Sequence, residues 1–287
     1  MKLNKKIVVP IVFAIVISWI VNIYMFSATA MEKPLLLSSY LGLSLSEGSG
    51  FELSYISNTY DEENIISASF PEISSKSFPI DFLSEEHIQN SNYSINRVRI
   101  NLDFVVLENG NRLIDTDETD PISIRKIQLG TSFGKTYEYD LGEICLFKEP
   151  LAEGNSLIFN YSNSSSGNYG STTLKTEDDI KINEIVSPSP LSDYILEVCD
   201  IEINEKALNS IALPLSLKAG EQIEVKYKFK SSIEMKPQYR FSNYLFPIVF
   251  KGIDSKGNTL LRNVFINGNN QYGITKKDIR KLIEESR

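Results

Sequence analysis

The chain is poor in the side chains that most often build catalytic and metal sites. Its 287 residues include one histidine, His87, two cysteines and one tryptophan. One histidine and two separated cysteines cannot supply the three or four ligands of a zinc site without carboxylates. The histidine also precedes Ser132 of the segment GTSFG, whereas a hydrolase with this serine turn carries its histidine after the serine. The sequence therefore contains no usable catalytic set.

The two cysteines, Cys145 and Cys199, leave the redox state of the chain open. Both lie in apolar runs that are typical of strands. In an exported protein a disulfide between them would persist, because extracytoplasmic compartments are oxidising. A free thiol packs equally well in an apolar strand, since it behaves as a small hydrophobic side chain. The sequence is thus consistent with one bridge or with two buried thiols.

Charged residues are absent from one long stretch near the amino terminus. Residues 7–26 are almost uninterruptedly apolar, and three of the six residues before them are lysine. Twenty helical residues reach about 30 Å, which is the thickness of the hydrocarbon core of a bilayer. Lysines before the helix predict that this end stays in the cytoplasm. We therefore expect a cytoplasmic tail over 1–6, a single-pass transmembrane signal-anchor over 7–27, and an extracytoplasmic remainder at the cell membrane.

A cleaved signal peptide is the alternative interpretation of the same segment. Ala28-Thr29-Ala30 has the small-residue spacing that a signal peptidase recognises. The apolar run is longer than the roughly 7 to 15 residues of a signal-peptide core, which favours a retained anchor.

Helical periodicity is nearly absent beyond this run, and a period of two replaces it. Apolar and polar residues alternate between 97 and 106 and again between 222 and 230. This alternation places one face of a strand in a core and the other in water. Asn109-Gly110 favours a tight turn after the first run, and residues 254–258 join a further pair of strands. Short strands separated by turn residues predict an all-β fold of antiparallel sandwiches.

We predict two antiparallel β-sandwich domains of immunoglobulin-like type after the amino-terminal helix. Ser187-Pro188-Ser189-Pro190 marks the boundary, because prolines hold the chain extended and donate no ladder hydrogen bond. Residues 162–171, rich in Ser, Asn and Gly, are expected to form a loop. The segment LSLKAGE at 215–221 resembles a turn common in bacterial immunoglobulin-like surface modules, which implies a sandwich in the second domain. The expected divisions are a linker over 28–50, an acidic domain over 51–186, a basic domain over 191–274 and an amphipathic C-terminal helix over 275–287, whose apolar face can dock on the last sheet.

The net charge of −8 conceals an uneven distribution of charge. Residues 31–199 carry 27 acidic and 11 basic side chains, whereas residues 200–287 carry 10 acidic and 15 basic ones. Ordinary variation in solvated surface charge is one explanation. The other is that the basic part meets an anionic partner, such as a cell-wall polymer or an acidic surface protein.

A short basic strip is the sharpest feature of the second half. Lys226, Lys228 and Lys230 alternate along one predicted strand and so share a face. Such a strip suits an anionic partner, although lysines also protect the edges of sheets. Tyr227 and Phe229 point to the opposite face and cannot stack on bases beside the lysines, so we do not expect nucleic acid as a partner.

An acidic stretch provides the best candidate for a metal site. Asp115, Asp117, Glu118 and Asp120 supply hard oxygen ligands of the kind that Ca²⁺ prefers. The stretch differs from a helix-loop-helix calcium loop, because Asp120 stands at the sixth position, where that loop has glycine. A calcium site in a loop and a solvated acidic turn both fit the pattern, and we expect no other cofactor.

The anchor and the lack of a catalytic set together favour a non-enzymatic role. We predict a single-pass membrane protein of bacterial type whose extracytoplasmic sandwiches bind, adhere to or organise material at the cell surface. Two alternatives remain open. One is a hydrolase of cell-wall carbohydrate with paired carboxylates that the sequence cannot place. The other is an accessory subunit of a membrane complex.

Overall fold

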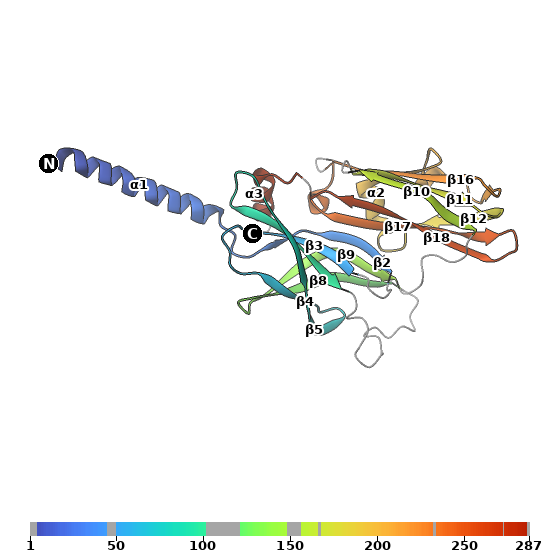
Figure 1. Cartoon of the computed structure of the whole chain (residues 1–287), viewed down its shortest axis with the longest axis horizontal. Helices are drawn as coiled ribbons and strands as arrows, with labels where there is room; N and C mark the ends of the chain where they lie inside the picture. Colours follow the sequence, from blue (N-terminus) through green and yellow to red (C-terminus); the bar gives the residue numbers. More distant parts are fainter. Residues whose placement is uncertain are drawn as a thin grey trace.

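The described residues are mostly β, and one of the three sheets that they form runs through both halves of the molecule. A four-stranded and a five-stranded sheet pack on different parts of a nine-stranded sheet (Figure 1). The expectation of an all-β fold built from sandwiches is confirmed. The structure is a computed structural model, and it describes residues 5–44, 50–101, 121–147, 156–165, 168–231, 234–271 and 273–285.

The strands pair in the following order. The four-stranded sheet runs β1 (Leu35–Leu36), β3 (Gly50–Asn58), β7 (Tyr93–Asn101), β6 (Asp81–His87). The nine-stranded sheet runs β15 (Leu215–Leu217), β12 (Ile180–Val186), β17 (Asn243–Asp254), β2 (Ser39–Ser44), β9 (Thr136–Phe147), β8 (Ile122–Thr131), β4 (Ile65–Phe70), β5 (Ser74–Pro79), and β18 (Thr259–Asn269) pairs with β17. The five-stranded sheet runs β10 (Leu157–Ser165), β11 (Tyr169–Thr176), β16 (Gln222–Phe229), β13 (Cys199–Ile203), β14 (Lys206–Ala207). The helices are α1 (Lys5–Thr29), α2 (Ser192–Val198) and α3 (Lys276–Glu285), with 3-10 turns η2 (Leu208–Ser210) and η3 (Pro237–Tyr239).

The first sandwich forms between the four-stranded sheet and strands β2, β9, β8 and β4. Its core takes alternate residues of strands such as β3 and β7, with Leu53 and Ile100 on one side and Ile127 and Ile144 on the other, whereas β6 is exposed along its whole length. This is the packing that the alternating sequence predicts, because residues two apart in a strand point to the same face.

The second sandwich places the five-stranded sheet over β12, β15, β17 and β18. Val225 and Phe229 of β16 point into its core and meet side chains such as Phe246 and Val264. Strands β17 and β18 form the expected hairpin around residues 254–258. The LSLKAGE segment crosses from β15 in one sheet to β16 in the other, as a connection in a sandwich does.

Strand β2 lies at the centre of the molecule, where both faces of the nine-stranded sheet are covered. It pairs in parallel with β17 and with β9, so this part of the sheet is not antiparallel as expected. Tyr40 points into the core of the second sandwich, and Leu41 and Leu43 point into the core of the first. The prediction of a linker over 28–50 is therefore wrong for residues 35–44. A strand buried on both faces loses the alternation that marks a half-exposed one.

The packing divides the chain at a different place from the sequence. The sequence assigned strands β10, β11 and β12 to the acidic domain over 51–186, but they belong to the second sandwich: β10 pairs with β11, β11 with β16, and β12 with β15 and β17. The proline-rich segment before residue 191 leads into α2, whose Ile195 and Val198 lie in the core of that same sandwich. Its prolines mark the entry to a helix, so they do not separate the two sandwiches.

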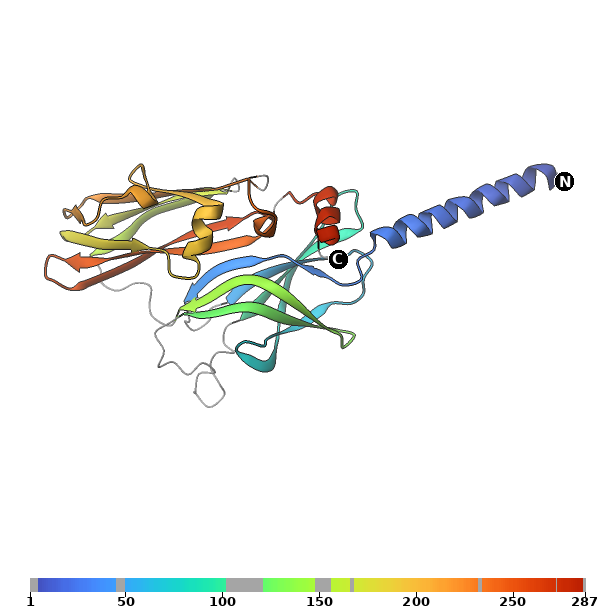
Figure 2. The ribbon, with the colours of Figure 1, turned by 180° about the vertical axis from the view of Figure 1, so that it is seen from behind.

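The C-terminal helix forms as predicted, but it docks elsewhere. Thr275 and Asp278 cap α3 reciprocally: the Thr275 amide and hydroxyl donate to the Asp278 carboxylate at 3.0 and 2.6 Å. Ile279 is fully buried and packs with Ile56 and Tyr93 on the outer side of the four-stranded sheet (Figure 2). The expected docking on the last sheet is therefore wrong. The sequence does not show that the outer side of the four-stranded sheet is left uncovered.

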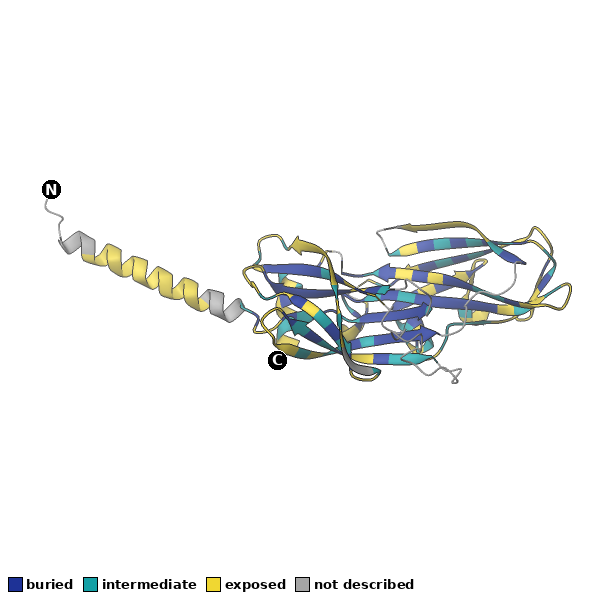
Figure 3. Cartoon of the chain, turned by 60° about the horizontal axis from the view of Figure 1, so that its bottom comes forward, coloured by how far each residue is buried: buried dark blue, intermediate teal, exposed yellow. Residues whose placement is uncertain are grey.

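Helix α1 extends away from the sheets, with its amino-terminal end farthest from them (Figure 1). All side chains from Val9 to Tyr24 are exposed (Figure 3). Within the described part of the chain, no helix combines the length and apolarity required of a membrane span, so the structure does not support the predicted transmembrane helix.

Candidate functional site

The candidate calcium ligands Asp115, Asp117, Glu118 and Asp120 lie outside the described residues, as does the predicted Asn109-Gly110 turn. The calcium site therefore stays a prediction. Among the residues that the structure describes, no group of three or more His, Cys, Asp or Glu side chains is placed to hold a metal ion.

The cysteines are two free, buried thiols. Cys145 lies on β9 and Cys199 at the start of β13, and both side chains contribute to the core of the second sandwich. The structure thus shows the second of the two alternatives left by the sequence, without the disulfide. Burial raises the pKa of each thiol to about 12, so neither is nucleophilic at neutral pH.

The three lysines of the basic strip have different surroundings. Lys226 pairs with Glu224 at 2.9 Å on its own strand. Lys230 donates to the carbonyls of Leu196 and Glu197, both at 3.0 Å, and so caps the end of α2. The strip is therefore interrupted. Lys230 stabilises the end of α2, and Lys226 and Lys228 have acidic neighbours.

Strand pairing converts the strip into a surface of mixed charge. Asp200 of β13 lies opposite Lys228, and Glu202 lies opposite Lys226. Directly opposed residues of an antiparallel pair share a face, so two carboxylates stand beside two ammonium groups. We call this the outer face of the five-stranded sheet. Because these two carboxylates offset the two ammonium groups, the outer face does not favour binding of a simple polyanion.

The outer face contains a hollow of about 520 Å³. Tyr169 of β11 is opposite Lys228 on one side of it, and Ser171 is opposite Lys226. Asn163 of β10 pairs with Ser171 and extends the row of polar groups. The hollow is lined by Asn163, Tyr169, Gly170, Ser171, Asp200, Glu202, Lys226, Tyr227 and Lys228.

Two tyrosine rings border the outer face. Tyr161 is 59% exposed and Tyr169 is 56% exposed. Tyr161 pairs with Thr173, four residues along β11 from Tyr169, so the two rings stand about 14 Å apart along the ladder. Exposed rings at this spacing, with hydrogen-bonding side chains between them, can hold an extended polar ligand with apolar C–H faces.

The hairpin that carries the tyrosines is held firmly on the sandwich. The Asn168 side chain, in the turn between β10 and β11, accepts from the Asn269 amide at 3.2 Å and also donates to Asn270. Below the hollow, a Cβ on Gly170 would lie 2.4 Å from the Tyr227 hydroxyl oxygen, so only glycine permits this close approach. The outer face is therefore rigid enough to present its groups in one arrangement.

A buried carboxylate joins the two halves of the molecule. Glu143 of β9 is 1% exposed and accepts from Arg125 Nε at 2.6 Å and from the Tyr194 hydroxyl at 3.3 Å, with Ser123 as a third donor. Tyr194 belongs to α2 and the other three residues to β8 and β9. Around it, the Tyr40 ring packs on Tyr194 at 5.0 Å between centroids. This cluster makes the junction a packed core.

Sequence reasoning missed the tyrosines, because composition suggested a loop over 162–171. The structure instead forms the β10–β11 hairpin there. A usable signal was the alternation from Tyr169 to Thr176, with threonines on both faces, since β-branched residues favour strands. The acidic partners of Lys226 and Lys228 were also visible as the alternation Asp200-Ile201-Glu202, but no sequence rule showed which strand would lie beside β16.

Comparisons with known proteins add little to this geometry. No protein-family model matches the chain, and no curated protein matches it either. Among solved structures, the fibronectin(III)-like modules of Clostridium thermocellum CbhA share 11% identity with it; the match covers 84% of this chain and 97% of theirs, with a TM-score of 0.20. A TM-score of this size does not establish a shared fold, so the description of the sandwiches depends on the strand pairings and cores given above.

Proposed function

We propose that the protein is a non-enzymatic binding protein that holds a hydroxyl-rich polysaccharide on the outer face of its five-stranded sheet. The observation that carries this proposal is the pair of exposed rings, Tyr161 and Tyr169, beside a hollow lined by carboxylates, lysines, an amide and a hydroxyl. The C–H faces of sugar rings pack on aromatic faces, whose quadrupole attracts positively polarised hydrogens. Both donors and acceptors are present to bind hydroxyl groups.

A glycan suits this face better than the anionic polymer suggested by the sequence. Two acidic and two basic side chains line the hollow, so a polyanion would be repelled by Asp200 and Glu202 as it approached Lys226 and Lys228. An uncharged chain meets no such opposition. We therefore propose a neutral glycan in place of an anionic wall polymer.

The test is a pull-down of the full chain with insoluble neutral polysaccharides, in a detergent without a sugar headgroup. We expect binding that changes little between about 0.05 M and 0.5 M salt, because ring packing is not screened. Replacing both tyrosines (Tyr161→Ala with Tyr169→Ala) removes about 1 kcal/mol per ring and so weakens binding by roughly tenfold or more.

Phe133→Ala is the matched control. Phe133 is also an exposed ring, at 62%, but it lies in the turn between β8 and β9 and lines no part of the hollow. Its removal is expected to leave binding unchanged. Equal losses in both variants, or binding that high salt abolishes, would contradict the proposal.

We also propose that α1 tethers the protein to a bacterial cell membrane, with the sheets on the extracytoplasmic side. The proposal is supported by the lysines before the apolar run and by the exposure of the apolar side chains between Val9 and Tyr24.

Alkaline carbonate extraction of cell membranes tests the tether. The full chain is expected to stay in the membrane pellet, whereas a chain lacking residues 1–30 should leave it. Protease added to intact cells should digest the sheets. Release of the full chain by carbonate, or protection of the sheets from protease, would rule out this arrangement.

A further inference from the structure

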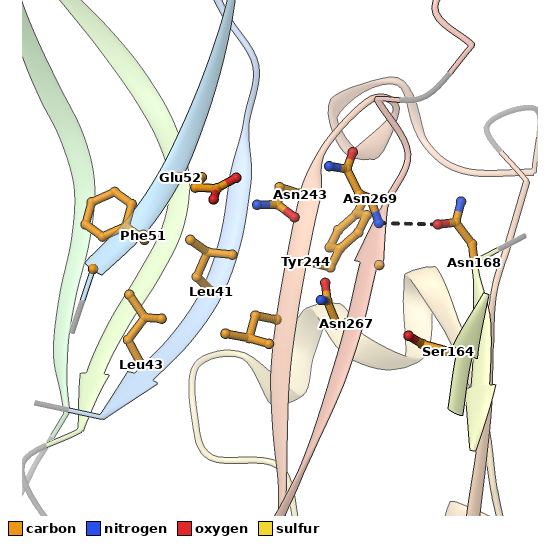
Figure 4. A pocket seen from close by; sticks show the side chains of 13 residues that line it. Leu41, Leu43, Phe51, Glu52, Ser164, Asn168, Asn243, Tyr244, Asn267 and Asn269 are labelled. Atoms are coloured by element: carbon orange, nitrogen blue, oxygen red, sulfur yellow. Dashed lines mark hydrogen bonds between the residues drawn. The ribbon is translucent and has the colours of Figure 1, made fainter. Parts of the chain in front are cut away.

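A second hollow lies at the junction of the two sandwiches (Figure 4). Its volume is about 570 Å³. Strands β2 and β3 of the first sandwich provide one wall, and β17, β18 and the β10–β11 hairpin of the second provide the other. The junction pocket is lined by Leu41, Leu43, Gly50, Phe51, Glu52, Ser164, Asn168, Asn243, Tyr244, Leu245, Asn267, Gly268 and Asn269.

Two asparagines of the pocket are part of its scaffold. Asn168 accepts from the Asn269 amide at 3.2 Å, the bond drawn in Figure 4. The Asn269 side chain in turn accepts from the Gln271 amide at 2.9 Å. These bonds tie the hairpin turn to the end of β18, so the polar wall is already formed before any ligand arrives.

The side-chain amides of the other two asparagines are available to bind a ligand. Asn243 is half-buried and Asn267 is exposed, and neither side chain hydrogen-bonds to another residue in the part of the chain that the structure describes. Each amide can donate two hydrogen bonds and accept two. Glu52 stands across the pocket from Asn243 and adds a carboxylate acceptor (Figure 4).

Charge narrows the class of ligand. Among the lining residues that the structure describes, Glu52 is the one charged side chain, and Arg99 lies directly opposite it on β7, so neither an anion nor a cation gains a strong partner there. On the opposite wall, Leu41 and Leu43 provide an apolar part beside Glu52. A ligand that matches both walls is uncharged, carries hydroxyls on one side and presents C–H groups on the other.

We infer that the junction pocket binds a single uncharged polyhydroxy unit, a monosaccharide or a small polyol. This site is separate from the outer face, because its two unpartnered amides come from β17 and β18 of the nine-stranded sheet. Among the lining residues that the structure describes, only those of the β10–β11 hairpin contribute to both hollows.

The test is saturation-transfer NMR and calorimetry on the full chain, in a detergent without a sugar headgroup. The probes are neutral hexoses and hexitols, with hexose phosphates and amino sugars for comparison. We expect the neutral compounds to bind and the phosphates not to. Asn243→Leu with Asn267→Leu should weaken binding roughly tenfold or more, because two amides are lost.

Matched variants separate this site from structural damage and from the outer face. Asn92→Leu, at an exposed asparagine in the turn before β7, is expected to bind normally. Glu52→Ala removes an exposed side chain and should weaken binding roughly threefold or more without lowering the melting temperature. The double tyrosine variant of the outer face should still bind the monosaccharide.

Three results would overturn the inference. One is full binding by both the double asparagine variant and the Glu52 variant. Another is binding of amino sugars or phosphates with no binding of neutral sugars. The third is loss of monosaccharide binding in the double tyrosine variant alone, which would move the ligand to the outer face and leave the proposed function intact.

Discussion

At the residue scale, the most consequential side chain is the buried Glu143 at the junction. Its carboxylate is almost fully enclosed, whereas its charged partner, Arg125, is 59% exposed. A buried charge without a partner is costly, while an exposed charge without one is not. The two residues of this ion pair should therefore differ in their effect on stability.

Arg125→Ala should lower the free energy of unfolding by about 2 to 3 kcal/mol, because Glu143 stays buried with only hydroxyl donors. Glu143→Gln should cost less, about 1 kcal/mol, since it removes the buried charge and leaves an exposed arginine. Urea unfolding of both variants measures this difference. A larger loss for Glu143→Gln would show that the ion pair does not have the role assigned to it.

The thiols give a second prediction at this scale. Cys145 and Cys199 are buried, and burial raises their pKa, so we expect neither to react with a thiol reagent at pH 7 until the chain unfolds. After denaturation without a reductant, both should react. Recovery of fewer than two reactive thiols would indicate the disulfide that the structure lacks.

At the element scale, the position of β2 depends on Gly42. A Cβ at this residue would lie 2.5 Å from Cδ of Pro247 and 2.8 Å from Cδ1 of Leu191. Gly42→Ala should therefore force β2 away from β17 and α2 and cost about 2 to 3 kcal/mol.

Gly134→Ala is the comparison for this variant. Gly134 has a φ of +76° and open space around it, so alanine there meets backbone strain of about 1 kcal/mol but no clash. Thermal melts of both variants measure the difference. Equal melting temperatures would mean that the close packing at β2 is not needed for stability.

The sequence predicted strands that have one buried and one solvent-exposed face. It failed for elements that are buried on both faces or rich in small polar residues. Strand β16 alternates in sequence and forms as expected, and β17 and β18 form the hairpin expected around residues 254–258. Strand β2 was missed because both its faces are buried, and the β10–β11 hairpin because its small polar residues suggest a loop. The site could not be assembled from sequence for a related reason. Lys226 acquires its neighbours from β11 and β13, and nothing local specifies which strands lie beside it.

At the scale of the whole molecule, the shared nine-stranded sheet and the tyrosine-rich junction make the two sandwiches one packed unit. Tyr40 and Tyr244 lie in the core there, and burial raises the pKa of both phenols, as it does for the two thiols. The folded state thus holds these protons more tightly than the unfolded chain does.

It follows that stability should be fully present below about pH 9 and should fall as the pH rises toward 12. Urea unfolding at about pH 8, 9, 10 and 11 measures how the free energy of unfolding changes with pH. The decline should follow a single cooperative transition, because both sandwiches share one sheet. Constant stability across this range, or two separate transitions, would contradict this picture.

The most direct test of the central claim is hydroxyl-radical footprinting of the full chain with and without a neutral polysaccharide. The extent of oxidation reports how accessible each side chain is. Bound glycan should protect Tyr161 and Tyr169, while Phe133 and Phe82, exposed on other strands and turns, should oxidise as before. Unchanged oxidation of both tyrosines at saturating polysaccharide would show that the outer face is not where the protein binds.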